Sequence, residues 1–158
     1  VTASGSASRR GSSSGIAAAR GDRRRERRVA RMPEKHLSCV LLADRHHALA
    51  EGVRGLLETA FGSVVMVAEE TSLLEGAARL QPDVAVVDLS LSHCRSLDWL
   101  RAVKERCPDL KLIVLSVHDE PNVRRAALEA GADEFVLKRA IVTDLLPAVD
   151  RVRGVATT

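Results

Sequence analysis

The sequence contains few aromatic residues, few cysteines and no long apolar run. Its 158 residues include two Phe, one Trp and no Tyr, so its core is expected to be aliphatic. No CxxC pair and no histidine at zinc-finger spacing is present, which argues against a disulfide framework or a structural metal and for free thiols at Cys39, Cys94 and Cys107. No stretch approaches the roughly 18 apolar residues of a membrane span, and no apolar signal segment is found. These absences favour a soluble, cytoplasmic protein with no membrane partner.

Positive charge is concentrated at the start of the chain. The first 35 residues hold ten Lys and Arg against three acidic residues, a local charge of +7. The net charge of the whole sequence is +3, so the other 123 residues together carry −4. This segment is rich in Ser, Gly, Ala and Arg and has no apolar periodicity, so residues 1–37 are expected to be a disordered tail. It has no interleaved aromatic residues, so a solvated tail is favoured over a nucleic-acid-binding arm. Residues 155–158 are expected to form a second, short tail.

Between the tails, short apolar runs alternate with segments of helical periodicity. Runs of Val, Leu and Ile predict strands that are buried on both faces, and spacings of three and four predict amphipathic helices. The expected strands are residues 39–43, 64–68, 84–87, 112–115 and 134–137. The expected helices are about residues 47–61, 72–80, 97–107, 121–131 and 143–153. Five such repeats favour a doubly wound parallel α/β sheet and are too few for an eight-stranded barrel.

Several residues have the chemistry of helix ends. Ser72 and Glu75 have the spacing of a capping box, and Gly131 fits a C-terminal cap. Thr143 fits the N-cap of the last helix, which would place Pro147 in its first turn.

Polar residues directly follow four of the expected strands: Asp44, Asp88, Ser116 and Lys138. The carboxyl ends of parallel strands meet at one edge of the sheet, so these groups are expected to gather there. Two carboxylates can share a divalent cation, and the cation can neutralise a phosphoryl group that is transferred to one of them. A hydroxyl and an ammonium group can hold the phosphoryl oxygens. Each residue alone has an ordinary structural explanation, but four at four strand ends predict a site.

Four segments resemble the receiver domain of bacterial two-component response regulators, especially receivers attached to helix-turn-helix DNA-binding domains. They are LLADRHHALAEGVRGLLE, PDVAVVDLSL, PDLKLIVLSVHDE and RRAALEAGADEFVLK. The resemblance covers residues 38–154 and implies a flavodoxin-like (βα)5 fold with strand order 2-1-3-4-5. It implies a role in phosphorelay signal transduction, in which a histidine kinase or phosphotransfer protein donates a phosphoryl group.

The resemblance also implies a role for individual residues. Asp88 is similar to the phospho-acceptor, Lys138 to the phosphate-pairing lysine, and Ser116 and Phe135 to the hydroxyl and the aromatic ring that switch together. The switch is then expected to change the surface made by the fourth helix, fifth strand and fifth helix, which would bind a downstream protein or a second copy of the chain. The implied Mg²⁺ ligands are Asp44, Asp88 and the backbone carbonyl of Ser90.

Two features depart from the family pattern. The family has two adjacent acids after the first strand, but here Asp44 is followed by Arg45. Two unit charges about 4 Å apart interact by about 4 kcal/mol at an effective dielectric near 20, so a fixed Arg45 would weaken Mg²⁺ binding. The loop after Asp88 lacks the family's Pro and two Gly and has Ser92, His93 and Ser96 instead.

These departures define an alternative function. A degenerate receiver, with Arg45 in the place of the cation, would act as a protein-interaction module without phosphorylation. An enzyme on this fold is disfavoured, because no glycine-rich nucleotide loop follows the first strand and no nucleophile has an evident partner base. His46 and His47 are interpreted as exposed first-turn residues rather than ligands.

The last expected helix ends close to Thr158. No DNA-reading domain is therefore expected in these residues, which would form either a stand-alone receiver or a fragment of a transcription regulator.

Overall fold

The computed structural model describes residues 38–93 and 95–154. The expected tails at residues 1–37 and 155–158, and the predicted free thiol of Cys94, lie outside the described residues. Within them, Cys39 and Cys107 are free thiols, as predicted. None of the helices in residues 38–93 and 95–154 has the length and apolar character needed to cross a membrane.

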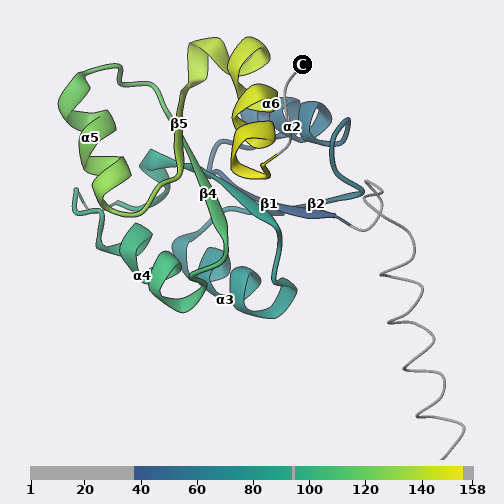
Figure 1. The fold of residues 1–158 in the computed structure, drawn as a ribbon, viewed down its shortest axis with the longest axis horizontal. Coiled ribbons are helices and arrows are strands. Elements are labelled where there is room, and N and C mark those ends of the chain that lie inside the picture. The colour runs from purple at the N-terminus through teal and green to yellow at the C-terminus, as the bar shows by residue number, and fades with distance from the viewer. Residues whose placement is uncertain (1–37, 94, 155–158) are drawn as a thin grey trace, which may run out of the picture. The chain divides into compact units, whose positions relative to one another are not determined.

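The described residues contain a five-stranded parallel sheet with the order β2-β1-β3-β4-β5 (Figure 1). This order confirms the predicted flavodoxin-like topology. The strands are β1 (Cys39–Ala43), β2 (Ser63–Val67), β3 (Val84–Asp88), β4 (Lys111–Ser116) and β5 (Glu134–Leu137). The α-helices are α2 (His47–Leu57), α3 (Glu70–Leu80), α4 (Asp98–Arg106), α5 (Pro121–Glu129) and α6 (Ile141–Val152). Two short 3-10 helices, η2 (Leu89–Leu91) and η3 (Lys138–Ala140), directly follow β3 and β5.

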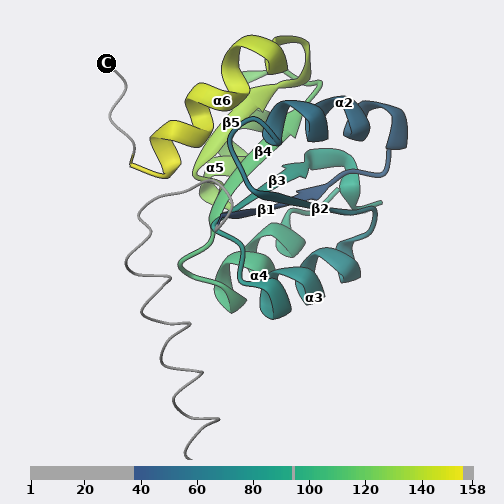
Figure 2. The ribbon, with the colours of Figure 1, turned by 90° about the vertical axis from the view of Figure 1, so that its right-hand side faces the viewer.

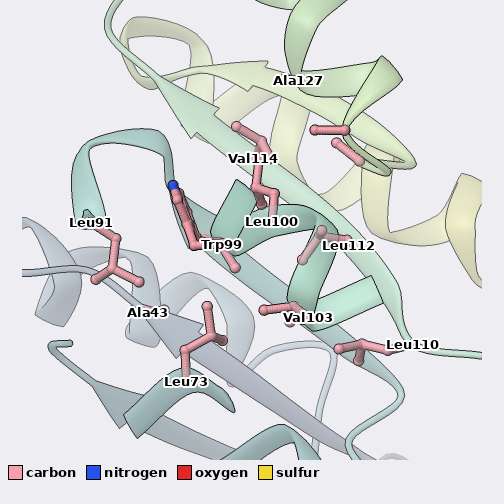
Figure 3. Packing of buried hydrophobic residues seen from close by; sticks show 14 of the residues in the cluster. Ala43, Leu73, Leu91, Trp99, Leu100, Val103, Leu110, Leu112, Val114 and Ala127 are labelled. Carbon is pink, nitrogen blue, oxygen red and sulfur yellow. The ribbon is translucent and has the colours of Figure 1, made fainter. Parts of the chain in front are cut away.

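Helices cover both faces of the sheet, with α2 and α6 on one side and α3 and α4 on the other (Figures 1 and 2). Side chains alternate between the two faces along each strand. In β1, Val40 and Leu42 pack with α2 and α6, whereas Leu41 packs with α3 and α4. Figure 3 shows the hydrophobic cluster between the sheet and helices α3 and α4, in which Trp99 of α4 lies among aliphatic side chains. The core is mainly aliphatic, as the composition predicts.

Several predicted boundaries of helices and strands are wrong. Strand β2 begins and ends one residue earlier than expected. Helix α2 ends at Leu57 rather than near Phe61. The backbone N–H and the hydroxyl of Thr59 both donate to the carbonyl of Leu56, three residues earlier, and so form a turn in place of a further α-helical turn. Helix α3 begins at Glu70 after an extended Glu69, whose carbonyl accepts the first helical hydrogen bond from Leu73. The expected capping box at Ser72 therefore lies inside the helix.

The start of α6 also differs from the prediction. The 3-10 helix η3 leads directly into Ile141, so Thr143 is not the N-cap. Its hydroxyl instead donates to the carbonyl of Ala140 at 3.1 Å. Pro147 lies beyond the first turn, inside the helix, where it removes one backbone hydrogen bond.

The end of α5 confirms the predicted glycine cap. Gly131 has a φ of 118°, and a Cβ added there would lie 3.1 Å from Cγ of Lys104. Gly131→Ala is therefore expected to lower the free energy of unfolding by about 1–2 kcal/mol, measured by urea denaturation. The matched control is Gly52→Ala in α2, where a Cβ meets nothing within 4 Å. The control should raise stability by up to about 1 kcal/mol, and a loss of equal size in both variants would contradict the prediction.

Candidate functional site

Buried charged groups from three strand ends meet at the carboxyl edge of the sheet. Asp88 is the last residue of β3, and Asp44 follows β1, in which Ala43 pairs with Val87. The two aspartates are 2% and 4% exposed, respectively. Lys138 follows β5, and its Nζ lies 3.0 Å from Oδ2 of Asp88 and 3.6 Å from Oδ2 of Asp44. The predicted convergence of these three residues is confirmed.

Asp88 is held as a carboxylate by its hydrogen bonds. Its Oδ1 accepts from the backbone N–H of Ser90 at 3.1 Å, and its Oδ2 accepts from the Ser90 hydroxyl at 2.8 Å. Burial alone would raise the pKa of Asp88, but the hydrogen bonds from Ser90 and Lys138 outweigh it and hold the pKa below its usual range. Asp88 is therefore ionised at neutral pH.

Asp44 has one satisfied oxygen and one orphaned oxygen. Its Oδ1 accepts from the backbone N–H of His46 at 2.8 Å. Its Oδ2 is buried and has no hydrogen-bond partner in the described part of the chain. A buried carboxylate oxygen without such a partner is costly. Since one Lys faces two carboxylates, the cluster has net negative charge, and these residues fit a divalent cation.

Arg45 points to the loop after β3. Its Nη1 lies 2.8 and 3.1 Å from the two ring nitrogens of His93. Among residues 38–93 and 95–154, no ion pair joins Arg45 to Asp44 or Asp88. The alternative in which Arg45 takes the place of the cation is therefore not favoured.

Ser116 and Phe135 occupy neighbouring strands beside this cluster. Ser116 ends β4, one residue beyond the register partner of Asp88, and its hydroxyl accepts from the backbone N–H of His118 at 3.0 Å. The Phe135 ring is 7% exposed and packs in the cluster that includes Ala127 of α5. The guanidinium carbon of Arg124 lies 6.0 Å from the ring centroid.

His46 lies in the site, although it was predicted to be an exposed first-turn residue rather than a ligand. Its side chain is 57% exposed, yet its Nδ1 lies 3.2 Å from Oδ1 of Asp44 and 3.5 Å from Oδ2 of Asp88. The available signal was its position two residues after an Asp, because Asp side chains commonly accept from the N–H two residues on. His47 is 83% exposed and faces Glu51 at 3.7 Å, so its interpretation as an exposed residue is confirmed.

Comparisons with known proteins identify the class. A family model described as the response regulator receiver domain matches residues 40–150. The nitrate/nitrite response regulator NarP of Escherichia coli is 34% identical over 120 residues, which cover 75% of this chain and 56% of NarP. The transcriptional regulatory protein DegU of Brevibacillus brevis is 29% identical over 112 residues, which cover 70% of this chain and 48% of DegU.

Solved structures give the same class. The signal receiver domain of the response regulator NarL from Mycobacterium tuberculosis has a TM-score of 0.67 and 31% identity, over 77% of this chain and 99% of that chain. RcsB from Salmonella enterica, bound to promoter rprA in the presence of phosphomimetic BeF3−, has a TM-score of 0.63 and 28% identity, over 72% of this chain and 66% of that chain.

The fold and the buried acidic cluster define a signalling domain of two-component systems. The chain belongs to the response regulator receiver domain family. It spans about half the length of the curated relatives that it matches.

Proposed function

We propose that this receiver accepts a phosphoryl group on Asp88 from the phosphohistidine of a kinase or phosphotransfer protein. The observation that carries the proposal is the environment of Asp88, a buried, ionised carboxylate at a strand end with Lys138 Nζ 3.0 Å away. A carboxylate oxygen attacks phosphorus and forms an acyl phosphate. The P–N bond of the donor breaks, and its imidazole keeps the electron pair and takes up a proton.

The groups around Asp88 suit this transfer. Lys138 pairs with the negative oxygens of the phosphoryl group, since its side chain is only 10% exposed and already faces both carboxylates. Asp44, Asp88 and the backbone carbonyl of Ser90 would hold Mg²⁺. When bound, the cation neutralises charge on the phosphoryl oxygens. The contact of Arg45 with His93 directs its guanidinium group away from an ion pair with either carboxylate.

Phosphorylation would then act through Ser116 and Phe135. The phosphoryl group adds negative charge and strong acceptor oxygens beside β4. Ser116 exchanges its hydrogen bond with His118 for one that it donates to the phosphoryl group, and Phe135 moves toward the space that Ser116 leaves. This shifts the population of conformations of the surface made by α5, β5 and α6.

The receiver is proposed to span residues 38–154 and to act in the cytoplasm. Its surface of α5, β5 and α6 would bind a downstream protein or a second copy of the chain. NarP and DegU are named as regulators, and RcsB was solved on a promoter. These relatives support a role in transcription regulation, with DNA reading by a segment other than this receiver.

The proposed switch predicts a separation between phosphorylation and response. In the wild-type protein, a small phosphoryl donor should change amide hydrogen exchange in α5 and β5. Ser116→Ala should still be phosphorylated but should lose most of this change, because the hydroxyl that would donate to the phosphoryl group is gone. Asp88→Asn, which has no acceptor, should show no change with the donor. An equal exchange response in wild type and Ser116→Ala would contradict the coupling.

Treatment with acetyl phosphate and Mg²⁺ tests the proposal itself. Intact-mass measurement should show one phosphoryl adduct per chain, and hydroxylamine should remove it because the product is an acyl phosphate. The adduct should disappear when a chelator removes the cation. Binding of the cation can be followed by fluorescence of Trp99, which packs in the same cluster as Leu91 of η2, the turn directly after Asp88 (Figure 3). Absence of any adduct with several donors would favour the phosphorylation-independent module.

A further inference from the structure

An imidazole nitrogen lies against the two buried carboxylates of the site. Asp44, His46 and Asp88 each offer one ligand atom, and these atoms lie within 4.8 Å of one another. Opposite ligands of an octahedral ion with bonds near 2.1 Å are about 4.2 Å apart. Small side-chain rotations would therefore bring all three groups onto one cation.

A second observation indicates that the cluster lacks a ligand. The side chain of Asp44 is 0% exposed, and its Oδ2 has no hydrogen-bond partner among the described residues. Lys138 Nζ is 3.6 Å from this oxygen but only 3.0 Å from Oδ2 of Asp88. A cation between the carboxylates would satisfy this buried oxygen.

The backbone presents the His46 ring to this position. His46 is the N-cap of α2, and its side chain makes no capping hydrogen bond to the helix. Its backbone N–H donates to Oδ1 of Asp44 at 2.8 Å, which fixes the residue beside the carboxylate. The tautomer with its proton on Nε2 has a lone pair on Nδ1, the atom nearest both aspartates. The ring is 57% exposed, so a cation can reach it from solvent.

The ligand chemistry sets the class of ion. Arg45 stands directly after Asp44 and contacts His93, and its guanidinium group has no oxygen to offer the cluster. Two carboxylates, the backbone carbonyl of Ser90 and one imidazole would form a mixed oxygen and nitrogen set. Mg²⁺ prefers oxygen ligands, whereas first-row transition metal ions also accept imidazole.

We infer that His46 is a direct ligand in this cation site and shifts its preference from Mg²⁺ toward a first-row divalent cation such as Mn²⁺. The inference rests on the proposed function for the role of the ion, but binding itself can be measured without phosphorylation. His47 provides a matched control, because it is adjacent, 83% exposed and turned toward Glu51.

The test is calorimetric titration of the full chain with MnCl2 and with MgCl2, together with pulsed EPR of bound Mn²⁺. His46→Ala should weaken Mn²⁺ binding by at least roughly tenfold, the loss typical even of outer-shell partners, and should leave Mg²⁺ binding nearly unchanged. Wild type should show coupling of Mn²⁺ to a ligand nitrogen, which His46→Ala loses and His47→Ala keeps. His46→Gln, with an amide in place of the ring, should lose the imidazole coupling as well.

Two results would overturn the inference. One is equal weakening of Mn²⁺ and Mg²⁺ binding in His46→Ala, and the other is an absence of nitrogen coupling in the 1:1 Mn²⁺ complex of wild type. Either result would mean that His46 serves only as a hydrogen-bond partner of Asp44. Phosphorylation of Asp88 distinguishes the two proposals: an adduct without nitrogen coupling leaves the proposed function intact, and coupling without an adduct leaves only the metal site.

Discussion

Asp88→Asn is expected to abolish the phosphoryl adduct. The amide keeps the size of the side chain and an oxygen that can accept from the backbone N–H of Ser90, so the fold should persist. It lacks the negative charge that pairs with Lys138 at 3.0 Å, and an amide oxygen does not form a stable acyl phosphate. The amount of adduct, measured by intact mass after treatment with a small phosphoryl donor, should fall to background.

Asp98→Asn is the matched control for this result. Asp98 lies in the first turn of α4, and its side chain is 81% exposed. Its amide variant should be phosphorylated as fully as wild type. An adduct that persists in Asp88→Asn would place the acceptor elsewhere, and peptide mapping of that adduct would identify the residue.

The position of the carboxylates and the lysine could be predicted because parallel pairing determines it. In β1 and β3, Ala43 pairs with Val87, so the next residue of each strand lies at the same edge. Lys138 could be placed there in the same way, because Leu137 pairs with Ser116 at the end of β4. The apolar runs located these strand ends, and the resemblance to receiver domains supplied the order of the strands.

The directions of Arg45 and His46 could not be predicted. Arg45 is long enough to reach either the carboxylates or solvent, and its observed contact is with His93, 48 positions away in a loop. His46 was assigned to an exposed first turn, and it is exposed, but its ring also contacts both aspartates. Both outcomes depend on loop geometry, which helical and strand periodicity do not determine.

Local capping signals were less reliable than strand pairing. Ser72 has capping-box spacing to Glu75, yet α3 begins earlier, at Glu70. The extended backbone of Glu69 and its hydrogen bond with Leu73 determine where the helix begins. The geometry of the β2–α3 connection thus outweighs a weak local preference.

Lys138→Met is expected to destabilise the protein in a buffer without divalent cations. Met keeps the length of the side chain but leaves Asp44 and Asp88 buried without their shared cationic partner. Removal of one member of a buried ion pair typically costs about 3–5 kcal/mol. The free energy of unfolding at neutral pH, measured by urea denaturation, should therefore fall by about 3 kcal/mol, and added divalent cation should restore part of the loss.

The pH dependence of this loss follows from the pKa of Asp88. In wild type its folded pKa is lowered, so its contribution to stability is present above the ordinary aspartate pKa and is lost as pH falls through the folded value. Without Lys138, burial is opposed only by the hydrogen bonds from Ser90, so the folded pKa of Asp88 should be higher than in wild type and the variant should lose less stability on acidification. The free energies of unfolding of wild type and Lys138→Met should therefore approach each other at low pH.

Arg139→Met provides the control for Lys138→Met. Arg139 is the next residue, but its side chain is 71% exposed and pairs with an exposed Asp119 at 2.8 Å. Exposed pairs contribute roughly 0–1 kcal/mol, so this variant should lose little stability at any pH. A loss in Lys138→Met no larger than in Arg139→Met would mean that water or protons already neutralise the two aspartates. Lys138 would then pair with the phosphoryl group without stabilising the unphosphorylated domain.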